Sequence, residues 1–372
     1  MCPTSYTLHP TSYFTTERSE SMKNCPQCNA EQAKRARFCN QCGTKISQND
    51  NASFEIINDC VIQDKTLYKY VGKEKNVKIP QGVSIIGEKA FMGVSISSVE
   101  IPDTVTEIKR EAFYLTNITE IKLPSNLAYI GDSAFANTKL KDVEIPASIT
   151  DMGESVFYSC KDLKSIKLPS TMTKISKKMC WCSGLEAVYI PDSVVSIGIC
   201  AFDCCASLST VSLPKNLKII EEDAFSTCTS LKKLSLPYGV TEIKSGAFSG
   251  CTSLKEINLP NTITVIEDGA FQDCEKLKTV TLPSDIKEIE FCTFMGCKSL
   301  TSIVIPKGVT EINIGAFDGC ESLKEITIPE TVKDVALNAF KGCKSLNEIK
   351  ISKDCMIMFD SYRRISLKVT RY

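Results

Sequence analysis

The chain has 372 residues and a mass of 41.0 kDa, which is larger than one hydrophobic core usually supports, so several domains or a repeat array are expected. Lys and Arg together number 44, as do Asp and Glu, so the whole chain has no electrostatic bias toward nucleic acid or an anionic membrane. No apolar run is long enough to cross a membrane as a helix, which excludes a transmembrane protein of that kind.

Residues 1–22 form a segment rich in Ser, Thr and Tyr, MCPTSYTLHPTSYFTTERSESM. The segment lacks the continuous apolar run that a secretory signal requires. We therefore expect a disordered extension and a cytoplasmic protein. Met22 stands just before the first cysteine motif and is an alternative start of translation.

Two C-x-x-C pairs follow within residues 23–45, Cys25 with Cys28 and Cys39 with Cys42. Two intervening residues let both thiolates of a pair reach one tetrahedral ion, and the second pair completes a set of four thiolates. The segment is too short for a core of its own, so metal binding would supply its folding energy. We predict a zinc ribbon with one structural zinc ion; a redox dithiol is the alternative.

Three basic residues, Lys34, Arg35 and Arg37, lie between the two cysteine pairs. One interpretation is that they contact the phosphates of a nucleic acid. The other is that they offset the negative charge of a zinc–tetrathiolate centre, and it is favoured because Phe38 is the only aromatic residue among them. Residues 46–58 begin as a polar stretch and are predicted to be a linker.

A repeat array follows the linker. Twelve prolines, from Pro80 to Pro329, recur every 22 or 23 residues, and Ser352 continues the spacing. A period of this size indicates a solenoid, in which each turn buries its apolar face only against its neighbours. We predict an N-terminal cap over 59–76 and a repeat array of about 12–13 turns over 77–351.

Each turn carries the same apolar pattern relative to its proline. The residues one and three positions before the proline are aliphatic, as at Ile257 and Leu259, which indicates a short strand with one buried face. The proline has no N–H to donate and ends that strand. A second apolar pair, such as Val240 and Ile243, indicates another short strand. An Ala-Phe pair ten and eleven residues after the proline predicts a short helical turn that places the ring in the core.

The pattern L-x-x-[IV]-x-[IL]-P, followed by V-T-x-I and A-F-x-x-C, resembles the leucine-rich repeats of BspA-like surface antigens of bacteria and protists. The resemblance covers roughly residues 77–351. It implies a predominantly β, parallel-stranded, curved solenoid that binds other macromolecules, and it transfers no active site. Members displayed on cell surfaces carry an export signal, and none is recognised here, so surface display is the alternative to a cytoplasmic location.

A cysteine stands nine residues before each later proline and before Ser352. One cysteine per turn predicts a ladder of buried thiols near the loop backbone, and Asn137 takes the same position in an earlier turn. Disulfides between neighbouring turns are the alternative, because stacked strands lie near the separation that a disulfide needs. The ladder consists of Cys160, Cys182, Cys205, Cys228, Cys251, Cys274, Cys297, Cys320 and Cys343.

The turn after Pro169 departs from the pattern. Cys180 replaces the phenylalanine, and Trp181, the only tryptophan, stands beside it. Five cysteines fall in this turn and the next, which allows a second metal site or a redox pair. The other interpretation is a repacked core in which Trp181 fills the volume that the missing ring leaves. The five are Cys180, Cys182, Cys200, Cys204 and Cys205.

The strand residue two positions before each proline should face solvent and is the candidate for partner contact. Early turns carry charged residues there, from Lys78 to Lys167, and the charge then disappears. Loss of charge along one face indicates a protein-binding surface; a surface that merely suits β-strands is the alternative. The candidate stripe consists of Tyr189, Ser212, Ser235, Asn258, Thr281, Val304 and Thr327.

The repeat phase is lost after Ser352, so residues 352–372 are predicted to form a C-terminal cap. The only histidine is His9, in the N-terminal extension, which excludes a Ser-His-Asp or Cys-His site in the repeat body. We therefore predict a non-enzymatic scaffold that binds a protein partner through the solenoid and carries a structural zinc ribbon. A cell-surface adhesin of the BspA-like type, and a regulator whose zinc ribbon contacts nucleic acid, are the alternatives.

Overall fold

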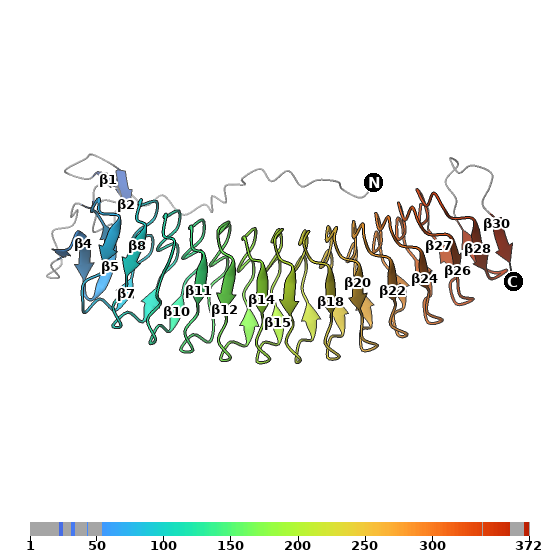
Figure 1. Ribbon diagram of the computed structural model, residues 1–372, viewed down its shortest axis with the longest axis horizontal. Coiled ribbons are helices and arrows are strands. Elements are labelled where there is room, and N and C mark those ends of the chain that lie inside the picture. Colours follow the sequence, from blue (N-terminus) through green and yellow to red (C-terminus); the bar gives the residue numbers. More distant parts are fainter. Residues whose placement is uncertain are drawn as a thin grey trace.

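Successive turns of the chain lie side by side in one gently curved row in the computed structural model (Figure 1). None of the described residues lies in a helix, and none forms a helix that could cross a membrane. The parallel-stranded solenoid predicted from the proline spacing is therefore confirmed. The structure describes residues 22–24, 31–33, 43, 54–336, 338–357 and 368–371.

The first strand of most turns lies just before the proline, and these strands form a row of parallel sheets that we call face A. In most of them the central residue is buried and its two neighbours are exposed, as the two-residue alternation of a strand requires. Neighbouring strands pair in parallel, so that Leu234 lies opposite Ile257. The strands of face A are β6 (Asn76–Lys78), β8 (Ser98–Glu100), β11 (Asp142–Glu144), β12 (Ser165–Lys167), β14 (Ala187–Tyr189), β16 (Thr210–Ser212), β18 (Lys233–Ser235), β20 (Glu256–Asn258), β22 (Thr279–Thr281), β24 (Ser302–Val304), β26 (Glu325–Thr327) and β28 (Glu348–Ile351).

The second strand of a turn has two residues, and these strands form face B. The second residue of each is buried, and pairing is again parallel, with Ile243 opposite Ile266. Most turns thus contribute one short strand to each face, as the two apolar pairs predict; among the described residues, no strand precedes Pro124 on face A and none follows Pro146 on face B. The strands of face B are β7 (Ile85–Ile86), β9 (Glu107–Ile108), β10 (Tyr129–Ile130), β13 (Lys174–Ile175), β15 (Ser196–Ile197), β17 (Ile219–Ile220), β19 (Glu242–Ile243), β21 (Val265–Ile266), β23 (Glu288–Ile289), β25 (Glu311–Ile312) and β27 (Asp334–Val335).

The Ala-Phe segment is not helical, contrary to the prediction. Two of its residues, nine and thirteen positions after the proline, have positive φ in every turn, for example 64° at Gly246 and 69° at Gly250. A left-handed residue every fourth position cannot belong to a right-handed helix. The backbone N–H of Phe248 instead donates to the carbonyl of Ala270 in the next turn, at 2.9 Å. The segment is a chain of tight turns that forms a third ladder between neighbouring repeats.

One continuous hydrophobic core runs from Cys60 to Cys355. Its centre is a column of phenylalanine rings, one in every turn except that of Cys180, whose neighbouring centroids lie between 5.0 and 5.8 Å apart and whose planes are nearly parallel. Tyr70 of the N-terminal cap extends the column, at 5.4 Å from the first phenylalanine. Stacking rings of one kind gives most repeats a buried aromatic contact on both sides.

Additional strands close both ends of the solenoid. β3 (Glu55–Ile57), β4 (Cys60–Gln63) and β5 (Thr66–Tyr70) form an antiparallel meander, and β5 pairs in parallel with β7 of the first turn. β3 lies in the range assigned to the linker, so the cap reaches further back than the hairpin predicted from the sequence. Beyond the last full repeat, β29 (Met356–Ile357) pairs with β27 and β30 (Lys368–Arg371) with β28, which continues the parallel ladder of each face.

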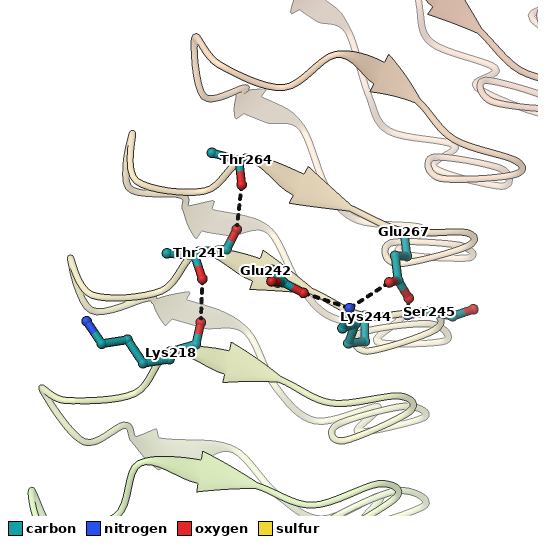
Figure 2. Close-up of polar contacts among 7 residues, drawn as sticks. All are labelled: Lys218, Thr241, Glu242, Lys244, Ser245, Thr264 and Glu267. Atoms are coloured by element: carbon teal, nitrogen blue, oxygen red, sulfur yellow. Dashed lines mark hydrogen bonds and ion pairs between the residues drawn. The ribbon is translucent and has the colours of Figure 1, made fainter.

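Polar side chains of face B also connect neighbouring turns (Figure 2). The hydroxyls of Thr241 and Thr264 each donate to a carbonyl of the preceding turn, at 3.4 and 3.5 Å. The ammonium of Lys244 lies 2.7 Å from a carboxylate oxygen of Glu242 in its own turn and 2.9 Å from one of Glu267 in the next. These two carboxylates raise the pKa of Lys244 above its usual value.

Candidate interaction surface

The outward residues of face A form the surface that the sequence marks for partner contact. Tyr189 is 66% and Val304 is 78% exposed, and the other members are exposed as well. Because the strands pair in register, Ser235 lies opposite Asn258 and Thr281 lies opposite Val304. The structure places in one line along face A the residues that we call the uncharged stripe: Tyr189, Ser212, Ser235, Asn258, Thr281, Val304 and Thr327.

The uncharged stripe is bounded by ion pairs between neighbouring turns. On its N-terminal side, Lys78 pairs with Glu100 at 2.9 Å and Lys167 pairs with Glu144 at 2.6 Å. On its C-terminal side, the Lys350 ammonium lies 3.4 Å from a carboxylate oxygen of Glu325. These flanking charges are balanced within the surface, whereas the stripe between them presents hydroxyl, amide and apolar groups.

Face A is hollowed along the uncharged stripe. A hollow of about 730 Å³ lies over four stripe residues, from Ser212 to Thr281. A second, of about 620 Å³, lies over Val304 and Thr327. Another of about 620 Å³ lies over charged residues nearer the N-terminal cap, including Glu100. Depressions are therefore a general property of face A, and the absence of charge distinguishes the stripe.

Two features beside the stripe were missed by the sequence analysis. The residue four positions before each proline also faces solvent, and in this column Lys233 pairs with Glu256 at 2.8 Å beside the larger hollow. The two-residue period of a strand could have predicted that this column faces solvent.

Tyr238 follows a proline and is 77% exposed, and no strand pattern marks it. Exposed tyrosines are typical anchors of protein interfaces, so Tyr238 extends the candidate surface.

The cysteine ladder is, with the exception of Cys182, a row of buried thiols. The thiol of Cys251 donates to the carbonyl of Phe225 at 3.2 Å, and the thiol of Cys274 to that of Phe248 at 3.3 Å. The remaining ladder thiols make the same contact with the preceding turn. Burial raises the pKa of the Cys251 thiol to about 12, so its proton is retained at neutral pH and is available to the carbonyl. The predicted thiol ladder is confirmed at these positions.

The ladder position is fourteen residues after each proline, and this excludes Cys182 from the ladder. In the 22-residue turn after Pro169, Ser183 takes the ladder position, is buried, and lies 3.3 Å from the sulfur of Cys205. Cys182 lies one residue earlier and is half-buried. The sequence pattern placed Cys182 in the ladder because positions were counted backward from the next proline. In a 22-residue turn one residue is missing between the ladder position and the following strand, so that count is wrong by one.

The same correction applies to Asn137. Thr138 takes the ladder position in that turn, and its hydroxyl lies 3.3 Å from the sulfur of Cys160. Asn137 instead occupies the second left-handed position of the turn, with a φ of 56°. From the second turn onward the ladder position therefore carries a short hydrogen-bonding side chain, a hydroxyl in some turns and a thiol in others, whereas the first turn has Val94 there.

The five-cysteine cluster predicted from the sequence is divided between three environments. Cys180 and Cys205 are buried in the core, and Cys200 is half-buried at the first left-handed position of its turn. The Cys205 thiol donates to the carbonyl of Cys180 at 3.1 Å, and Cys182 lies beside Cys204, its N–H donating to the carbonyl of Asp203 at 2.8 Å. No group of three or more His, Cys, Asp or Glu side chains that could hold a metal ion occurs in the part of the chain that the structure describes.

Trp181 does not fill the gap in the phenylalanine column, and that interpretation of the sequence is wrong. Cys180 takes the phenylalanine position and is fully buried. Trp181 is half-buried and lies against Tyr158, with ring centroids 4.7 Å apart. Its indole N–H donates to Asp203 at 2.8 Å, and the ammonium of Lys178 lies 5.1 Å from the ring centroid. The indole thus joins three neighbouring turns at the surface.

The cysteines predicted to bind zinc lie outside the described residues. The structure describes a strand on either side of the first pair, β1 (Met22–Asn24) and β2 (Glu31–Ala33). The two strands pair antiparallel, with Lys23 opposite Gln32. The four predicted ligands are Cys25, Cys28, Cys39 and Cys42.

The repeat region matches a family model, the BspA type leucine rich repeat region, over residues 61–181, 177–301 and 287–363. These segments cover more than half of the chain, so the protein belongs to the BspA-type leucine-rich repeat family. A comparison with curated proteins finds no match.

Solved structures share the solenoid. A leucine-rich repeat protein from Bacteroides ovatus is 26% identical, with a TM-score of 0.68 over 83% of this chain and 90% of that one. A leucine rich cell surface protein from Faecalibacterium prausnitzii is 29% identical, with a TM-score of 0.53 over 83% of this chain and 95% of that one. The pneumococcal vaccine antigen PcpA, 20% identical with a TM-score of 0.54 over 88% of this chain and 98% of that one, shares the fold alone.

Proposed function

We propose that the protein is a non-enzymatic scaffold that binds a protein partner through the uncharged stripe of face A. The observation that carries the proposal is the alignment of seven exposed, uncharged residues, six of which line two hollows, between ends whose charges are paired. Interfaces are depleted of charge at their centre and are bounded by a polar rim, and the stripe has this arrangement.

The chemistry of the stripe suits a folded protein surface. Tyr189 and Val304, together with the nearby Tyr238, supply large exposed groups that lose little rotamer entropy on binding. Ser235 and Asn258 contribute a hydroxyl and an amide that can adapt their hydrogen bonds to a partner. Because Ser235, Asn258 and Val304 lie in one four-stranded parallel sheet, their backbones are held at fixed spacing, which lowers the entropy lost on association.

The test is a double substitution in the larger hollow, Asn258→Arg with Thr281→Arg. Two guanidinium groups placed over adjacent strands would fill the hollow and add unpaired charge, so capture of proteins from a native extract should fall at least tenfold. The matched control is Thr264→Arg, which changes an exposed residue next to face B. Proteins retained by the wild type and the control but lost by the double variant would identify the partner. Equal capture by all three would reject the stripe as the binding surface.

We propose further that the segment containing Cys25, Cys28, Cys39 and Cys42 holds one structural zinc ion. Four cysteines at this spacing supply the thiolate set that zinc prefers, and the antiparallel pairing of β1 with β2 suits a hairpin that carries the first pair. Native mass spectrometry should find one zinc ion per chain, and Cys39→Ser should lose it. A zinc-free wild-type chain, purified without chelator, would count against this module.

A second candidate is display on a cell surface as an adhesin. The observation in its favour is the similarity to a leucine rich cell surface protein from Faecalibacterium prausnitzii. The ladder thiols such as Cys251 and Cys274 donate hydrogen bonds to carbonyls, which favours the cytoplasmic location, because disulfides form and persist in oxidising compartments. Protease treatment of intact cells separates the two locations: a surface protein is cut, whereas a cytoplasmic protein is cut only after lysis.

A further inference from the structure

Cys182 and Cys204 form a pair that the binding surface does not use. They occupy the same position, thirteen residues after the proline, in adjacent turns. The Cys182 N–H donates at 2.8 Å to the carbonyl of Asp203, the residue immediately before Cys204. The two cysteines are therefore held side by side by the backbone ladder.

The pair differs from the ladder thiols in exposure and in partners. Both cysteines are half-buried, whereas Cys228 and Cys251, which are also neighbours in adjacent turns, are fully buried and donate to carbonyls. The hydroxyl oxygen of Thr227 lies 3.2 Å from the Cys204 sulfur. The Cys204 hydrogen bond and the nearby charge of Lys161 hold the pKa of the Cys182 thiol below its usual range.

The backbone at these positions is also one that cysteine rarely adopts. Cys182 has a φ of 55° and Cys204 a φ of 58°, and later turns place glycine at this position, as at Gly250 and Gly296. A left-handed L-residue costs roughly 1–2 kcal/mol relative to its usual conformation. Other turns place Leu115, Ser159 and Thr227 at this position with positive φ, so the left-handed backbone belongs to the repeat, and what sets the two cysteines apart is that they are adjacent.

We propose that Cys182 and Cys204 form a reversible oxidation site, in which a peroxide converts the two thiols into a disulfide between adjacent turns. Neighbouring residues of a parallel ladder lie near the Cα separation that a disulfide requires. The Cys182 sulfur attacks one peroxide oxygen, which gives a sulfenic acid and releases water or an alcohol. The Cys204 sulfur then attacks the sulfenic sulfur, the S–S bond forms, and the hydroxyl leaves as water. With hydrogen peroxide the balance is two thiols and one peroxide to one disulfide and two water molecules.

The test is treatment of the reduced, folded full-length chain with hydrogen peroxide, followed by peptide mapping. A disulfide should join the peptides containing Cys182 and Cys204, with loss of the mass of two hydrogens, and a thiol reductant should restore both thiols. In Cys204→Ser, a sulfenic acid should accumulate at Cys182 and be trapped by dimedone. Cys182→Ser should give neither product at these positions.

Both variants are expected to fold, because neighbouring turns carry Ser159 and Thr227 at the same position. The internal control is the pair Cys228 and Cys251, which should stay reduced under the same treatment. A dithiol-bridging arsenical, phenylarsine oxide, supplies a measurement that needs no oxidant: it should protect Cys182 and Cys204 together from alkylation. Cross-linking of other cysteines instead, or independent alkylation of the two thiols in the presence of the arsenical, would overturn the proposal.

Discussion

Glu290 lies on face B beside a second carboxylate, and its environment disfavours the charged form. Burial and the neighbouring Glu288 raise the pKa of Glu290 from its usual 4.5 to about 7. The amide of Asn313 in the next turn donates to Glu290 at 3.1 Å and opposes this shift only in part. Because the folded-state pKa exceeds the unfolded value, the protonated group favours the folded state at low pH, and this contribution is lost as the pH rises from about 4.5 through about 7.

Glu290→Gln should therefore stabilise the protein at high pH and change it little at low pH. Glutamine is neutral throughout and keeps a carbonyl oxygen for Asn313, so the charged state that the fold disfavours is removed. We expect the melting temperature of the variant to exceed that of the wild type at pH 8 and to match it at pH 4. The control is Glu311→Gln, an exposed carboxylate of the same face. A wild-type advantage at pH 8 would show that Glu290 is not the group responsible.

At the scale of single elements, face B depends on contacts between its two-residue strands as well as on burial. Lys244 shows this: it contacts Glu242 in its own strand and Glu267 in the next turn, and its side chain is only 27% exposed. Lys298, by comparison, contacts one carboxylate, that of Glu275, and is 50% exposed. Removing one partner of a partly buried ion pair costs more stability than removing one partner of an exposed pair, because water solvates the remaining buried charge only in part.

Lys244→Met should lower the free energy of unfolding by about 1 kcal/mol, since it leaves two carboxylates close together without their cation. Lys298→Met should cost less, because a single exposed pair is well screened by water. Urea unfolding at low and high salt measures both: the difference between the variants should narrow as salt rises. An equal cost for the two lysines would mean that the bridge between turns adds nothing to face B.

The elements differ in how far the sequence could predict them. The strands of both faces were predictable, because apolar residues two or three positions apart and a proline at fixed spacing allow little else. The tight turns were not predictable. Glycine at a left-handed position would have indicated a turn, but many of these positions carry other residues, such as Lys89, Glu111 and Ser133. The uncharged stripe followed from strand alternation alone. The pairing of Cys182 with Cys204 was not predicted. The two cysteines share a position only when residues are counted forward from the preceding proline, and the ladder positions were counted backward from the following proline.

At the scale of the whole molecule, the hydrogen bonds and ring contacts named for the described turns join each turn to itself or to its immediate neighbours. The phenylalanine rings stack only on adjacent rings, and the ladder thiols donate only to the preceding turn. The column is interrupted once, at Cys180, without interrupting the parallel strands of the turns on either side. A solenoid that is stabilised by contacts between neighbouring turns can lose one complete turn and still fold, provided that the remaining strands keep their repeat positions.

Deletion of residues 238–260, one complete 23-residue turn, should therefore leave a folded solenoid. The deletion joins Pro237 to Asn261 and so keeps the proline–asparagine junction that Pro260 makes with Asn261 in the wild type. It also brings Phe225 next to Phe271 in the column. Circular dichroism should retain its shape, and thermal unfolding should remain cooperative with a modest loss of stability. Deletion of residues 238–249 is the control, because it removes half a turn and puts every later strand out of phase. Unfolding of both variants would show that the turns depend on contacts beyond their neighbours; folding of the first alone is the result expected of independent, stacked repeats.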